Sequence, residues 1–208
     1  MRKIFGFYAL PLHILFRPIN GFYEMKFEKQ GNLKIALLNF VLVCISFAFF
    51  NQYTSILVNE SHPHWLNSLG DFFNIAAVLL LFCLSNWAVT SLTDGEGKFM
   101  EILMAICYAM TPLILTLIPA ALLSNVITID EAGFFHLLVG FGVLWFVVLV
   151  FVGLIVVHNY TVLKAISTIF LTAVALLIIL FLITLFFTLV QQLVVFIQSL
   201  YREVSFRM

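Results

Sequence analysis

Residues 94–119 read DGEGKFMEILMAICYAMTPLILTLIP, and this stretch holds the chain's one acidic-glycine turn between two long apolar runs. Gly95 and Gly97 allow the backbone to reverse where side chains would clash. Glu96 and Glu101 bring negative charge to the start of the helix that follows, where the helix dipole favours it. The stretch therefore predicts a structural turn that leads directly into a membrane-spanning helix.

Two prolines, Pro112 and Pro119, fall inside that expected helix at membrane depth. Proline removes a backbone donor and favours a kink, and lipid tolerates the freed carbonyls only where neighbouring helices or Ser/Thr side chains satisfy them. We therefore expect the third span to be interrupted at these prolines and to lie at the centre of the protein.

Composition places the chain in a membrane. It is 63% hydrophobic and only 10% charged, with a mean hydropathy of +1.15, whereas about a quarter of the residues in a soluble domain are charged. The formal net charge is zero and no basic run is interleaved with aromatics, which argues against nucleic acid as a partner. Cys44, Cys83 and Cys107 lie in apolar runs, where a thiol behaves as a small hydrophobe. No disulfide, metal or cofactor is predicted.

Five apolar runs are long enough to cross a bilayer, which takes roughly 20 residues. They span residues 33–52, 70–92, 101–124, 134–157 and 165–190. The predicted fold is an all-α integral membrane protein with five transmembrane helices. Residues 1–32 are expected to form an amphipathic cytoplasmic or interfacial segment, residues 33–201 the transmembrane domain and residues 202–208 a short tail.

Within the N-terminal segment, Arg2 and Lys3 are expected among the lipid headgroups, with aromatic residues such as Phe16 below them. Asn20 is expected to cap a short helix that buries its apolar side and turns Lys26 outward.

Basic residues divide unevenly between the two sides of such a bundle. With the N-terminus inside, eight Lys and Arg residues are cytoplasmic, and only Arg202 and Arg207 are outside. This is the bias of the positive-inside rule. It predicts a multi-pass protein of the cell membrane, surrounded by lipid, with a cytoplasmic N-terminus and an external C-terminus.

Small and polar side chains recur at helical spacing in the last three spans. The third span has a face of small residues, and the fourth has Gly140, Gly142 and Gly153, which favour close helix packing or a local bend. The fifth span has neither Gly nor Pro after Lys164 and is expected to be straight. Its stripe of polar residues offers hydrogen bonds to a neighbouring helix: Thr184, Thr188, Gln191 and Gln198.

The blocks GEGKFMEI and YAMTP, preceded by GFYEMKFEKQG and followed by HNYTVLKA, carry a family resemblance over about residues 14–190. The chain resembles the Yip family of Ypt/Rab-interacting five-span membrane proteins, in the short form found in prokaryotes. The resemblance implies a five-helix bundle with a cytoplasmic N-terminus and the C-terminus on the far side. In eukaryotic members it implies binding to Rab-type GTPases and a role in membrane trafficking.

Other motifs favour structural interpretations. GEGK lacks the spacing of a phosphate-binding loop, and a helix start capped by Thr93 or Asp94 is expected instead. Pro63 separates two histidines in a loop whose metal-binding potential is low, because the spacing fits no helical ligand pair; the possible ligands are Glu60, His62, His64 and Asp71. His136 and His158 are expected at helix ends near the membrane interface.

The interior of the five runs contains no Asp, Glu, Lys or Arg, so a catalytic base or a proton-coupling group is missing there and no enzyme is predicted. Ser, Thr and Asn residues in the runs are expected to join helices by hydrogen bonds. The predicted function is a scaffold that binds other integral membrane proteins, as in a transport complex. Its expected contacts are the polar stripe and the charged turn residues Asp94, Glu96, Lys98 and Glu101. The alternative is a small-solute channel or carrier, in which broken helices line a cavity.

Overall fold

A computed structural model describes residues 10–55, 58 and 67–207 of the 208-residue chain. Residues 10–16 are helical, and a 3-10 turn, η2, covers Ile129–Glu131. The labelled α-helices are α2 (Pro18–Lys26), α3 (Leu33–Tyr53), α4 (Ser68–Leu92), α5 (Phe99–Ala109), α6 (Thr111–Leu123), α7 (Ala132–His158) and α8 (Val162–Arg207). Within the described residues, five apolar segments are long enough to cross a membrane, counting α5 and α6 as one, which confirms the predicted fold class.

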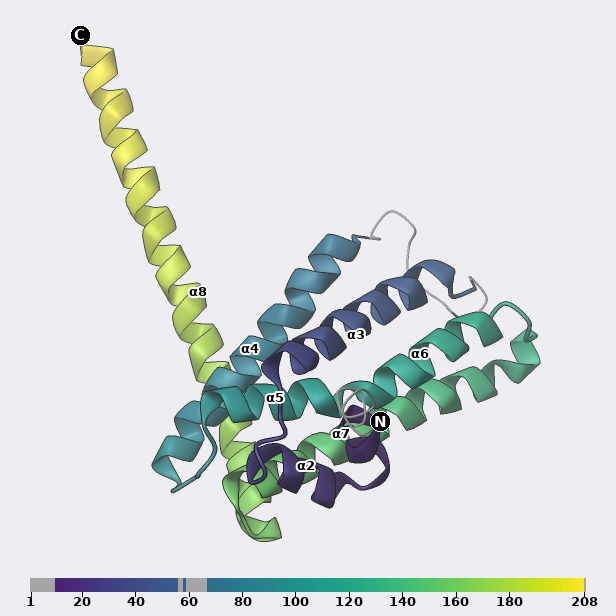
Figure 1. The fold of residues 1–208 in the computed structure, drawn as a ribbon. Helices are drawn as coiled ribbons and strands as arrows, with labels where there is room; N and C mark the ends of the chain where they lie inside the picture. Colours follow the sequence, from purple (N-terminus) through teal and green to yellow (C-terminus); the bar gives the residue numbers. More distant parts are fainter. Residues whose placement is uncertain (1–9, 56–57, 59–66, 208) are drawn as a thin grey trace.

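The third span lies at the centre of the bundle, as its prolines predicted. Two-thirds of its most apolar window is buried, against one-third or less for each of the other four spans. Its expected small face is buried in full, namely Ala105, Ala109, Pro112, Thr116 and Ala120. In Figure 1, α5 and α6 lie among α3, α4 and α7, and each of these three helices packs against the third span.

The two prolines act differently. The third span is broken at Met110, and Pro112 occupies the first turn of α6, where a missing backbone N–H costs nothing. Pro119 lies inside α6, is exposed, and does not end the helix. Opposite the break, Asn39 of α3 donates from its amide to the Cys107 carbonyl (2.6 Å) and to the Thr111 hydroxyl (3.2 Å). The Tyr108 carbonyl, which Pro112 deprives of its donor, accepts from the Thr111 hydroxyl (2.7 Å), so a neighbouring helix and a Thr side chain together satisfy the freed backbone.

Close packing between α7 and its neighbours depends on two of its glycines. A Cβ at Gly142 would overlap the Thr116 side chain of α6, and one at Gly153 would press on the Phe22 ring. Gly140 has open space around the same position, so its predicted packing role is wrong.

Helix α2 packs against α7 and α5 at one end of the bundle. Phe22 and Met25 are buried, as expected for one side of the helix, whereas the apolar side chains of Ile19 and Tyr23 are exposed. Two details of the prediction are wrong. The helix starts at Pro18 rather than after an Asn20 cap, and Lys26 turns inward, with only 9% of its side chain exposed. Arg2 and Lys3 lie outside the described residues.

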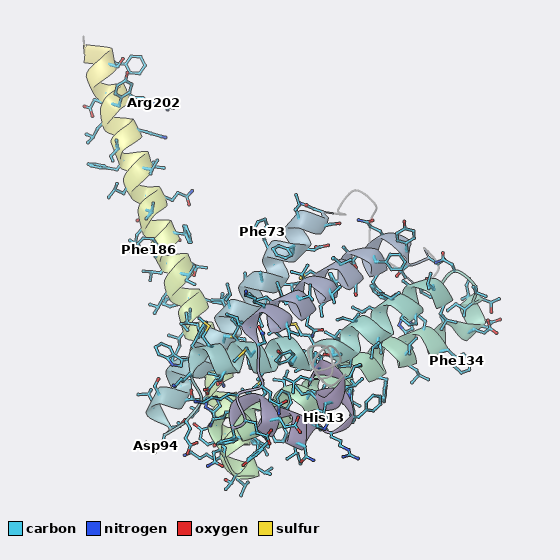
Figure 2. The ribbon with its side chains drawn as sticks, viewed as in Figure 1. His13, Phe73, Asp94, Phe134, Phe186 and Arg202 are labelled. Atoms are coloured by element: carbon cyan, nitrogen blue, oxygen red, sulfur yellow. The ribbon has the colours of Figure 1, made fainter. Side chains whose placement is uncertain are left out.

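Helix α8 leaves the bundle. Its first turns pack on α4, where Ala165, Thr168 and Thr172 are buried. From Phe181 to Glu203 every residue is exposed, and Figure 1 shows this yellow-green part projecting alone. Phe186 and Arg202 mark this free part in Figure 2. Its straightness follows from the lack of Gly and Pro, as predicted.

Candidate interaction surfaces

The turn between α4 and α5 is built by close approach to the end of α7. A Cβ at Gly95 would lie 2.6 Å from the Tyr160 hydroxyl, and one at Gly97 would lie 2.7 Å from the His158 ring. Neither glycine has a positive φ; Asp94 is the residue in the left-handed conformation, at φ 53°. At both positions glycine leaves space for a docked neighbour, and neither position requires a positive φ. We call the end of the bundle where residues 93–98 pack on the end of α7 the turn end.

His158 links that turn to the helices beneath it. It is the last residue of α7, which agrees with its predicted place at a helix end, but its side chain is buried, with 1% exposed. Its Nδ1 accepts a hydrogen bond from the Gly97 N–H (3.3 Å), which places the ring proton on Nε2, 3.1 Å from the Asn86 side-chain oxygen. The Asn86 amide donates to the Thr172 hydroxyl (3.1 Å), which donates to the carbonyl of Thr168.

These hydrogen bonds form one continuous network from the turn through α7 and α4 to α8. Because each polar group in the network has a partner, the network is stable in an apolar interior. Both ring nitrogens of His158 are occupied, so the ring has no free nitrogen to serve as a base or a metal ligand in this arrangement. The sequence signal was the HNY triplet at the end of the fourth span, which periodicity alone could not place against Gly97.

A second set of contacts ties α2 to the same turn. The Lys26 ammonium donates to the Val157 carbonyl (2.7 Å) and to Glu96 (3.2 Å), which also accepts from Asn159 (3.4 Å). The bond from Lys26, followed by that from Asn159, lowers the pKa of Glu96 below its ordinary value. Lys26 thus caps the carbonyl end of α7 while its charge holds the turn.

Helix α5 begins at Phe99 with Lys98 as its N-cap, so the predicted caps Thr93 and Asp94 are wrong. The Lys98 backbone N–H donates to the Glu101 carboxylate (3.0 Å). Thr93 instead ends α4. Glu96 and Glu101 are bonded within the chain, although Glu96 stays exposed. Asp94, labelled in Figure 2, and Lys98 are also exposed on the turn.

The stripe on α8 is exposed along its whole length. Thr184 and Thr188 donate to the carbonyls of Phe181 and Thr184 in their own helix, which leaves each hydroxyl oxygen able to accept another bond. Gln191 and Gln198 are exposed further along. The structure keeps these four residues together on one helix and places none of them near the turn.

The remaining predicted polar residues divide into two groups. Asn39 and Asn86 join helices, as expected, whereas Ser46, Ser85, Thr90 and Thr116 bond to carbonyls of their own helices.

Of the weak metal set, only Asp71 lies in the described residues, and it accepts a bond from Asn51 (3.2 Å). Glu60, His62 and His64 lie outside them. His136 is exposed near the start of α7.

A groove of roughly 960 Å³ runs between α4 and α7. Ile106 and Met110 of α5 contribute to it, and α8 supplies Ile166 and Ile169. The lining is apolar except for Asp71 and Asn74 of α4. Asn74 is exposed, and its amide has no hydrogen-bond partner among the described residues. Sequence periodicity did not reveal this groove, because it depends on the direction in which α8 leaves.

Among the described residues, four apolar spans and a buried, broken third span define an all-α, multi-pass membrane protein. A family model, the Yip1 domain, matches residues 12–191, so the chain belongs to the Yip1 family, as the resemblance indicated. Neither the curated proteins nor the solved structures contain a match to the chain.

Proposed function

We propose that the protein is a non-enzymatic scaffold of the cell membrane that binds other integral membrane proteins, as an accessory subunit of a transport complex. One observation carries this proposal: α8 leaves the bundle and exposes an apolar surface longer than a bilayer covers. The exposed turn residues Asp94 and Lys98 supply a second, polar contact.

The length of α8 supports a protein partner rather than lipid alone. Its mainly apolar part, residues 162–200, is roughly 58 Å long at 1.5 Å per residue, against about 30 Å of hydrocarbon. A tilt of 40°, the upper end of the usual range, lengthens the path through that hydrocarbon to only about 39 Å. The part of α8 that extends beyond the hydrocarbon contains Leu193, Phe196 and Ile197, which are all exposed. Apolar side chains beyond the lipid need protein to cover them.

The test is retention of identified membrane proteins after purification from native membranes in mild detergent. Replacing Thr184, Thr188 and Gln191 together with Leu removes the polar stripe and should release the partners while the protein still folds, because all three are exposed. Replacing Lys98 with Ala should weaken retention without affecting folding. Leu115→Ala on the exposed side of α6 is the matched surface control. Unchanged retention in both sets of variants would contradict the scaffold function.

The second candidate is a small-solute channel or carrier, and the break at Met110 favours it, because transporters place helix ends at membrane depth. Asn39 and Thr111 already satisfy the Cys107 and Tyr108 carbonyls at this break, which supports a structural role instead. The protein should be reconstituted alone in liposomes with a panel of labelled ions and small solutes. Saturable uptake would replace the scaffold with the carrier.

A further inference from the structure

We infer that the groove between α4 and α7 is filled by α8 of a second copy of this chain, which gives a reciprocal dimer in which each copy inserts its fifth span into the other. The inference rests on the proposed function, in which α8 is an interaction arm, and names the partner for the part of α8 inside the membrane. Among the described residues of one chain, no helix fills the groove and no other helix covers α8 from residue 181 to residue 203.

The groove has the size and chemistry of a helix site. At a helix diameter of 10–12 Å and a rise of 1.5 Å per residue, its volume corresponds to about two turns of helix. Its walls are apolar side chains of α4 and α7, such as Val78 and Phe151. The free part of α8 offers matching side chains, such as Leu177 and Phe181, that have no partner in their own chain.

The chain's own α8 cannot return to the groove. The hydrogen bond from Asn86 to Thr172 holds the first turns of α8 against α4. Beyond Thr172, α8 runs away from α4 and α7 (Figure 1). To fold back onto the groove, α8 would need a sharp kink, and it contains neither Gly nor Pro to provide one. A second copy reaches the groove without any change in α8, by a two-fold rotation about the membrane normal, which keeps both chains in the same orientation.

Asn74 identifies the contact within the groove. An amide facing lipid without a partner is unfavourable, so it should meet an acceptor on whatever occupies the site. Asn74 lies twelve residues before Asn86 on α4, and Thr184 lies twelve residues after Thr172 on the antiparallel α8. The separation along each helix is therefore about 18 Å, so an α8 of a second copy that lies along α4 in the groove can bring its Thr184 to Asn74. The bond between Asn86 and Thr172 already shows this chemistry in the chain.

Rotation explains why this second pair does not form within one chain. Twelve residues turn a side chain by about 120° around a helix, in the same sense on both helices when seen from one end. Since Asn86 and Thr172 face each other, Asn74 and Thr184 leave the α4–α8 pair on opposite sides. Consistent with this, both are exposed. A Thr184 hydroxyl from a second copy lying in the groove approaches the side of α4 that its own Thr184 cannot reach.

The experiment is disulfide formation between two differently tagged chains in the same membrane, one carrying Asn74→Cys and the other Thr184→Cys. Cys44, Cys83 and Cys107 are buried, so the parent sequence serves as the uncrosslinked background. Mild oxidation should link the two tags. Phe73→Cys replaces Asn74→Cys in the control, because Phe73 is exposed on α4 (Figure 2) but does not line the groove, and it should not crosslink.

A second measurement does not depend on cysteines. Asn74→Leu keeps an apolar groove but removes the hydrogen bond from both halves of the dimer, which should weaken association about tenfold. Photobleaching steps of single labelled molecules in liposomes report the dimer fraction as the protein is diluted in lipid. A third variant carries both cysteines in one chain, and a disulfide within that single chain would overturn the inference. It would also be overturned if no disulfide formed above the Phe73 control and single molecules bleached in one step. If other membrane proteins are still retained in that case, the scaffold function stands and only the dimer is wrong.

Discussion

Gly97 lies at a close contact of the turn end, where a Cβ would meet the side chains of His158 and Val157. Replacing Gly97 with Val should reduce the folded yield, because each of those side chains is already packed and overpacking of a tight site costs about 1–3 kcal/mol or more. The measurement is the fraction of monodisperse protein after extraction in mild detergent. Gly140→Val, which enters open space, is the matched control and should keep the parental yield.

Glu96 gives the turn a pH dependence whose sign follows from its contact with Lys26. Because the pKa of Glu96 is lowered in the folded protein, its contribution to stability is present above the unfolded value, near 4.5, and is lost as the pH falls through the folded pKa. Glu96→Gln should therefore lower the Tm at neutral pH by a small amount and have no effect at low pH.

Melting curves of the parent and Glu96→Gln over a pH series provide the measurement. Asp94→Asn is the control at a second exposed carboxylate of the turn, since asparagine also adopts the left-handed backbone found there. A difference between parent and Glu96→Gln that persists unchanged at low pH would show that the ion pair with Lys26 is not its source.

At the scale of elements, the broken third span depends on α3. Asn39→Ala leaves the Cys107 carbonyl and the Thr111 hydroxyl without their interhelical donor, at an expected cost of about 1–3 kcal/mol. Ser46→Ala on the same helix is the control, because that buried hydroxyl bonds only to the Leu42 carbonyl of its own helix. Thermal unfolding in detergent should therefore separate the two variants, and equal Tm values would mean that the break needs no support from α3.

At the scale of the whole molecule, positive charge collects at one end of the bundle. Lys26, Lys98 and Lys164 lie at or next to the helix ends that meet at the turn end, whereas Asp130 and Glu131 lie in η2 at the opposite end. Figure 2 shows the two ends at Asp94 and Phe134. By the positive-inside rule, the turn end should face the cytoplasm.

Single cysteines at positions 98, 130 and 207, in a background without the native three, test this orientation. An impermeant thiol reagent applied to intact cells should label positions 130 and 207 and leave 98 unlabelled. Labelling at 98 but not at 130 would reverse the topology. The absence of labelling at 207 would show that α8 does not cross the membrane, which would also remove the basis of the reciprocal dimer.

The sequence by itself determined the class of protein, the five spans and the central third span, because apolar length, proline and small residues act locally along a helix. It also identified the turn as structural, since glycines and charges between two apolar runs have few other uses. Only the tertiary structure decided that His158 occupies the space left by Gly97 and that Lys26 turns inward to Glu96. The same holds for the groove beside Asn74. The two contacts join residues 61 and 70 positions apart, and helical periodicity carries no information about which distant faces meet. The direction of α8 is likewise a property of its contact with α4, set by Asn86 and Thr172, and not of its own apolar sequence.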